Sequence, residues 1–127
     1  MRSTFPLRDE ASFLELAVAV LAEAAPWFTP PTSQAFVAPF RSEGERDGVS
    51  VILRRVASSP DPYAGGPTET CELSLESGEG WVRIRLEMLA WVGPELVVVT
   101  RGEPRMKKAA EACIRTFLAA FERPAAT

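Results

Sequence analysis

Three consecutive antiparallel strands are predicted by ETCELSLESGEGWVRIRLEMLAWVGPELVVVTR, the stretch from Glu69 to Arg101. Apolar and polar residues alternate along most of it, as they do in a strand whose successive side chains point to opposite faces of a sheet. Two short segments that contain glycine interrupt the alternation, at residues 77–80 and 92–95. The pattern therefore predicts a meander of three strands joined by two tight turns.

The register of the first hairpin follows from its turn. Residues 77–80 read Ser-Gly-Glu-Gly, and we expect Gly78 to take the positive φ that a two-residue turn requires at its first central position. With Gly78 and Glu79 as the loop, Ser77 faces Gly80. The predicted pairs are then Glu76–Trp81, Leu75–Val82, Ser74–Arg83, Leu73–Ile84, Glu72–Arg85 and Cys71–Leu86. A slip of one residue would move the whole apolar set into water, so the alternation specifies this register strongly.

The second turn, Val92-Gly93-Pro94-Glu95, predicts a different distribution of side chains. Setting Val92 opposite Glu95 gives the pairs Trp91–Leu96, Ala90–Val97, Leu89–Val98 and Met88–Val99. Val97 and Val99 would then join the core face. Apolar side chains would also gather on the face that is polar in the first hairpin, namely Leu89, Trp91, Leu96 and Val98.

Composition limits the classes of function. The chain has 127 residues, and we interpret residues 1–127 as a single domain. The formal net charge of −3 argues against a nucleic-acid partner. Histidine is absent, which removes the commonest general base and metal ligand. We find no catalytic residue, metal site or cofactor signature, and we interpret the high Arg, Ala and Pro content as a bacterial coding background.

A helix is predicted at each end of the chain. The first spans Asp9 to Ala25 and is apolar around most of its circumference. Acidic residues near its start disfavour a signal peptide, and its apolar run is too short for a membrane span, so we expect a cytoplasmic protein. The second spans Glu103 to about Glu122 and is amphipathic. Its apolar stripe includes Cys113, and we interpret Cys113 and Cys71 as buried thiols.

The middle of the chain predicts two further strands. These are Gln34–Arg41 and Val49–Ala57, with a charged loop at Ser42–Gly48 and a turn at Asp47-Gly48. An irregular segment rich in proline and glycine follows at Ser58–Thr68. Its only tyrosine, Tyr63, is either a contact residue or the side chain that pins the loop, and we favour the second interpretation.

The predicted fold is therefore α+β. One mainly antiparallel sheet of about five strands lies between an N-terminal and a C-terminal helix, in the order α-β-β-β-β-β-α. This element order is similar to that of cystatin-like and helix-grip architectures. The similarity concerns the order of elements alone and implies no function.

Two surfaces are candidates for binding. Contiguous apolar surface usually marks an interface, so we predict a partner-binding patch formed by Leu89, Trp91, Leu96, Val98 and Trp81. Equally, the apolar first helix would cover this face within the monomer. A weaker candidate is an anion site at the start of the second helix, formed by Arg101, Arg105, Lys107 and Lys108. The acidic residues Glu72, Glu76 and Glu87 lie among arginines, and we interpret them as a cross-strand charge ladder rather than a catalytic pair.

These observations favour a small non-catalytic protein-interaction module, such as an adaptor, a chaperone or an immunity-type partner. It would form a homodimer or bind another protein through the apolar patch. The alternative is a module that binds a small apolar ligand in a pocket between the curved sheet and the C-terminal helix, under the Ser58–Thr68 loop. An enzyme built on arginine and glutamate is a weaker third hypothesis. We expect no cofactor, nucleic acid or membrane partner.

Overall fold

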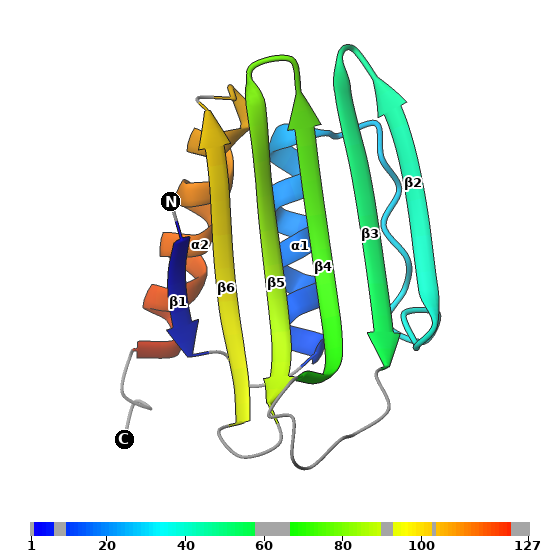
Figure 1. Cartoon of the computed structure of the whole chain (residues 1–127), viewed down its shortest axis with the longest axis vertical. Coiled ribbons are helices and arrows are strands. Elements are labelled where there is room, and N and C mark those ends of the chain that lie inside the picture. The colour runs from blue at the N-terminus through cyan, green and yellow to red at the C-terminus, as the bar shows by residue number, and fades with distance from the viewer. Residues whose placement is uncertain (1, 7–9, 58–66, 90–92, 103, 123–127) are drawn as a thin grey trace.

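The fold is an α+β structure in which one antiparallel sheet carries both helices (Figure 1). A computed structural model describes residues 2–6, 10–57, 67–89, 93–102 and 104–122. The five predicted strands and the two flanking helices are confirmed in the predicted order. A short additional strand at the N-terminus was not predicted. The strands are β1 (Arg2–Pro6), β2 (Phe40–Arg46), β3 (Val49–Ala57), β4 (Pro67–Ser77), β5 (Gly80–Leu89) and β6 (Gly93–Gly102); the helices are α1 (Glu10–Ala24) and α2 (Met106–Glu122).

The six strands lie in the order β1-β6-β5-β4-β3-β2. The register predicted between β4 and β5 is confirmed for every pair from Cys71–Leu86 to Ser77–Gly80. The turn differs in one detail, because the positive φ falls on Gly80 (143°) and not on Gly78. Within the turn, the Ser77 hydroxyl accepts a hydrogen bond from the Glu79 amide at 3.2 Å, which is a local bond typical of serine in turns.

The register predicted between β5 and β6 is wrong. Gly93, Pro94 and Glu95 belong to β6 instead of forming a turn, and Leu86 faces Leu96 while Ile84 faces Val98. The observed pairing differs from the predicted one by an odd number of residues, so every side chain of β6 changes face. Leu96 and Val98 are therefore buried in the core, and Val97 and Val99 share the opposite face with the arginines of β5. The free energy gained by burying Leu96 and Val98 under the helices exceeds the local preference of residues 92–95 for a turn.

Strand β2 also differs from its prediction. The predicted strand Gln34–Arg41 overlaps it by two residues, and most of the expected loop Ser42–Gly48 is strand. The expected turn at Asp47-Gly48 is confirmed, with φ of 55° and 76°, the left-handed conformation that joins tight hairpins. On the side that faces the helices, Trp27 packs so closely that a Cβ added to Gly44 would lie 3.1 Å from the indole ring. Because β2 is a charged edge strand, it lacks the apolar alternation that would have revealed it.

Both helices cover the same face of the sheet (Figure 1). Helix α1 lies against β4, helix α2 lies against β5, and the two helices contact each other. The apolar first helix is thus buried on the core face and does not cover the second face. The core side chains are almost fully buried, and the largest of them are Phe13, Phe36, Leu16, Leu21, Leu53, Leu73, Leu75, Ile84, Leu86 and Leu96.

An arginine connects the chain before β2 to the sheet. The Arg55 guanidinium donates hydrogen bonds to the Glu69 carboxylate and to the backbone carbonyl of Phe36. The same guanidinium lies 5.7 Å from the centre of the Phe36 ring, which itself stacks on Phe13. These contacts position the irregular segment before β2 against the core.

Candidate functional site

The face of the sheet opposite the helices is the main candidate site. We call it the open face, because no described helix lies on it (Figure 1). The pairing of the strands places alternate residues of β2 to β6 there. Charged side chains dominate: the cations are Arg41, Arg54, Arg83, Arg85 and Arg101, and the anions are Glu43, Glu45, Glu72, Glu76, Glu87 and Glu95.

Glu72 is the centre of a network of ion pairs on the open face. Its carboxylate accepts a hydrogen bond from Arg54 at 2.9 Å and lies 3.5 Å from Arg85 Nε, although only 10% of its side chain is exposed. Arg85 also lies 3.7 Å from Glu87. A carboxylate this well covered is destabilising unless cations lie beside it, and here two arginines do. The predicted cross-strand ladder is thereby confirmed for Glu72. The pair of Arg85 with Glu87 lies within β5, and Glu76 has no ion pair among the described residues.

Arg83 has a different environment from its neighbours. Its guanidinium lies 4.2 Å from the centre of the Trp81 ring, a cation–π contact on the open face. No carboxylate in the described part of the chain lies within ion-pair distance of it. The Arg83 guanidinium is therefore held in place by an aromatic ring, and no carboxylate of the described ranges neutralises its charge.

The open face contains two neighbouring depressions of opposite charge. The first, of about 380 Å³, is lined by four arginines and two glutamates, with Ile52 and Ser74 between them. The second, of about 400 Å³, is lined by Glu43, Glu45 and Glu76 and by no arginine or lysine. Ile52 and Glu76 line both depressions, which therefore adjoin each other. The arginines of the first depression are Arg41, Arg54, Arg83 and Arg85.

The predicted apolar patch is not assembled as expected. Leu96 and Val98 lie in the core, for the reason of register given above. Leu89 lies at the end of β5, and Trp91 lies outside the described residues. Trp81 is the one predicted member whose described side chain lies on the open face.

The predicted anion cluster lies where several chain segments meet. The Arg105 guanidinium donates a hydrogen bond to the Asp47 carbonyl at 2.8 Å, and the Arg105 amide donates to the Glu79 carboxylate at 3.2 Å. Glu79 thus already supplies a negative charge just before α2, where the helix dipole favours one. Arg101 and Lys108 are exposed and Lys107 is half-buried. Binding of an external anion by these four residues stays a prediction.

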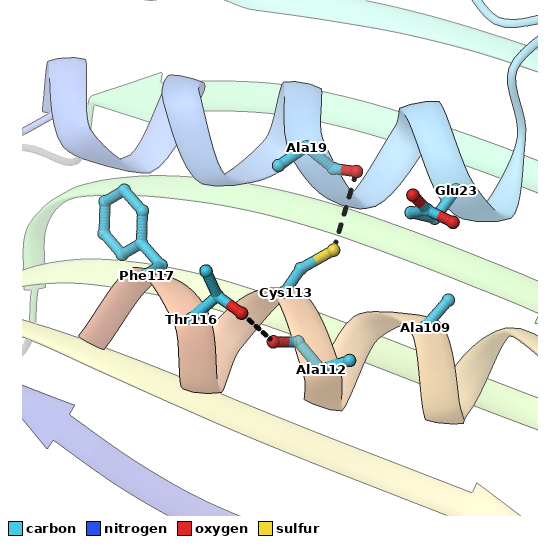
Figure 2. A pocket seen from close by; sticks show the side chains of 7 residues that line it. All are labelled: Ala19, Glu23, Ala109, Ala112, Cys113, Thr116 and Phe117. Atoms are coloured by element: carbon cyan, nitrogen blue, oxygen red, sulfur yellow. Dashed lines mark hydrogen bonds between the residues drawn. The ribbon is translucent and has the colours of Figure 1, made fainter. Parts of the chain in front are cut away.

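A third hollow lies between the two helices, away from the open face (Figure 2). It has a volume of about 440 Å³ and is lined by Ala19, Glu23, Ala109, Ala112, Cys113, Thr116 and Phe117. Cys113 was expected in the buried stripe of the last helix, yet it is half-buried and its Sγ lies 3.6 Å from the Ala19 carbonyl. Partial burial, and then the nearby Glu23 carboxylate, raise the pKa of the Cys113 thiol. This thiol is consequently a poor nucleophile at neutral pH.

The remaining predictions concern the Ser58–Thr68 loop, Cys71, metal sites and membrane spans. Tyr63 lies outside the described residues, as does most of the Ser58–Thr68 segment. Cys71 is fully buried, as predicted. Across the described ranges, no group of three or more acidic residues and cysteines could hold a metal ion. Neither described helix is long and apolar enough to cross a membrane.

Several charged residues of the open face were not predicted there, among them Arg41, Arg54, Glu43 and Glu45; the two glutamates fell in the expected loop Ser42–Gly48. Arg41 was placed at the end of a strand with the wrong bounds, and Arg54 was not assigned to a face. The tight Asp47-Gly48 turn was the available signal, because counting outward from it alternates Arg41, Glu43 and Glu45 on one face. Comparison with known protein families, curated proteins and solved structures finds no match to this chain.

Proposed function

We propose that this chain is a small non-catalytic protein-interaction module that binds another protein surface through its open face. The observation that supports this most directly is Arg83 stacked on Trp81, on a face that no described helix covers. Tryptophan and arginine are the residue types most enriched among the energetic hot spots of protein interfaces. A planar guanidinium that is already oriented can bind a partner's carboxylate with two parallel hydrogen bonds.

The Glu72 network supports the proposal in a second way. Arg54 and Arg85 are long side chains that would lose rotamer freedom on binding, but Glu72 already holds both. Ordering such a side chain at an interface costs about 0.5–1.5 kcal/mol, so side chains ordered beforehand favour association. The open face is therefore organised for contact before a partner arrives.

The proposal keeps the function class expected from the sequence and changes the surface. The expected patch was apolar, whereas the open face is mainly charged, with Trp81, Ile52 and Val99 among its apolar side chains. Arginine-rich surfaces with a few aromatic residues are common at interfaces whose partners associate reversibly. The binding partner is accordingly a folded surface that carries charges of its own.

The alternative function, binding of a small apolar ligand between the sheet and α2, has less support. Met106, Ala110 and Ile114 of α2 are buried against the sheet and fill that layer among the described residues. The hollow between the helices is lined mostly by small side chains and by a thiol that is weakly ionised.

A cytoplasmic, bacterial origin also belongs to the proposal. The acidic residues Asp9, Glu10 and Glu15 stand where a secretion signal has basic or apolar residues, which supports the cytoplasm. The arginine-rich composition supports a bacterial origin.

The test compares three forms of the full chain as bait for protein partners. These are the wild type, a W81A/R83A variant of the open face, and a V18A variant, because Val18 is exposed on α1 and lies on the helix side. A true partner binds the wild type and the V18A variant equally and binds W81A/R83A at least about tenfold more weakly, as expected when hot-spot residues are removed. Partners that bind all three forms equally would contradict the proposal.

A further inference from the structure

The two depressions of opposite charge suggest which protein binds the open face. One copy of the chain presents an arginine-rich depression directly beside a depression lined by glutamates. From this arrangement we infer that the partner is a second copy of the same chain, bound face to face as a homodimer. This inference rests on the proposed function and specifies its partner.

Symmetry makes the two depressions complementary to each other. In a two-fold dimer the same surface is used by both copies, so each contact occurs twice. We place the two-fold axis in the plane between the two faces, where it runs between the depressions near Ile52. This axis sets the arginine-rich depression of each copy over the acidic depression of the other. Both contacts are then attractive, and the face needs no second kind of partner.

The particular charges fit this arrangement. Arg83 has no carboxylate within ion-pair distance among the described residues. No ion pair within the described chain engages Glu45 or Glu76, which lie in the acidic depression. As far as the described residues go, each copy thus offers an uncompensated cation and two uncompensated anions in neighbouring places, whereas Glu43 is paired with Arg41 of its own chain. Half-buried Ile52, which lines both depressions, supplies an apolar contact near the axis.

The whole open face has about the size of a standard dimer interface. Strands of 5 to 11 residues make up the six-stranded sheet. With strands about 4.8 Å apart and a rise of about 3.4 Å per residue, the face covers roughly 800 Å². A standard stable interface buries about 800 Å² on each partner.

The experiment uses native mass spectrometry and sedimentation of the full chain at micromolar concentration. The wild type should form a dimer, twice the monomer mass of 13.9 kDa, and the dimer should weaken as salt is raised. Two variants reverse charge in one depression each: R83E in the arginine-rich one and E43R/E45R in the acidic one. Each variant alone should dimerise at least about tenfold more weakly, because like or neutral charges now face each other in both contacts.

Mixing the two variants provides the decisive result. A mixed dimer keeps one contact between unlike charges, which joins the arginine-rich depression of E43R/E45R to the acidic depression of R83E. E43R removes the ion pair of Glu43 with Arg41 but leaves all four arginines of that depression in place. The mixture should therefore form a heterodimer that neither variant matches as a homodimer, and the two masses identify it. Circular dichroism checks that each variant folds, and R83Q replaces R83E if the latter does not.

Three outcomes would overturn the inference. A wild type that stays monomeric, a dimer that survives both reversals, or a mixture with no gain would each exclude pairing of the open faces. The proposed function has a separate readout, because a heterologous partner that is lost only on W81A/R83A would still support it. Failure of both experiments would remove the proposed function as well.

Discussion

Replacing Leu96 with alanine tests the observed register between β5 and β6. Leu96 is 0% exposed and faces Leu86, which is also 0% exposed. The substitution removes three carbons, worth about 0.8 kcal/mol each in transfer from water, or roughly 2.4 kcal/mol. The cavity left in a well-packed sheet raises the loss of unfolding free energy to about 3–4 kcal/mol.

The assay is urea unfolding followed by tryptophan fluorescence and circular dichroism. With an m-value of about 1.5 kcal/mol/M for a domain of this size, the midpoint should fall by about 2 M while the m-value stays constant. The matched control is Val99→Ala, because Val99 is on the same strand, half-buried, and on the open face opposite Arg83. Its loss should stay below about 1 kcal/mol.

The opposite result would refute the register. In the pairing that the turn at residues 92–95 predicted, Leu96 is on the surface patch and Val99 is in the core. A loss below about 1 kcal/mol for Leu96→Ala, combined with a larger loss for Val99→Ala, would therefore restore the predicted pairing and with it the apolar patch.

Two further predictions concern single positions. Gly80 has a φ of 143°, and a methyl group there would overlap the Arg101 carbonyl. Gly80→Ala should therefore lower the unfolding free energy by more than about 2 kcal/mol. The control is Gly78→Ala, which should change the unfolding free energy by less than about 0.5 kcal/mol because the space around Gly78 is open. Equal losses in the same urea assay would show that the hairpin tip differs from the one described. Burial, and then the Glu23 carboxylate, raise the pKa of Cys113. Glu23→Gln should therefore lower that pKa, increase the thiolate fraction and speed alkylation of the native protein by maleimide at pH 8. The control, Glu15→Gln, should leave the alkylation rate unchanged. Mass spectrometry of the labelled protein measures the rate and should locate the adduct on Cys113 and not on fully buried Cys71; an unchanged rate for Glu23→Gln would exclude the electrostatic contribution.

The first hairpin could be predicted because its information is local. Strict alternation on both sides of Gly78-Glu79 allows one register only, since any other would expose Leu73, Leu75 and Ile84. The two helices could be predicted for a similar reason, because their apolar positions and flanking prolines are contiguous in the chain. The fold class followed from these elements.

The edges of the sheet could not be predicted in this way. Strand β2 alternates charged residues with small ones, and β1 is only five residues long. Such segments become strands because a neighbouring strand offers them hydrogen-bonding groups. For β1 that neighbour is β6, which is distant in the chain. Local propensity carries no signal of this kind.

For this chain, alternation and turn residues were enough to set the β4–β5 register and the α+β class, because both depend on neighbours within a few residues. Tertiary packing decided the face of every β6 residue. Its residues 93–99 read Gly-Pro-Glu-Leu-Val-Val-Val, which is apolar on both faces toward its end and therefore compatible with either pairing. Both helices lie on one side, and burial beneath them selected Leu96 and Val98 for the core. The same packing left the other face uncovered and brought Arg41, Arg54 and Arg83 together from three different strands.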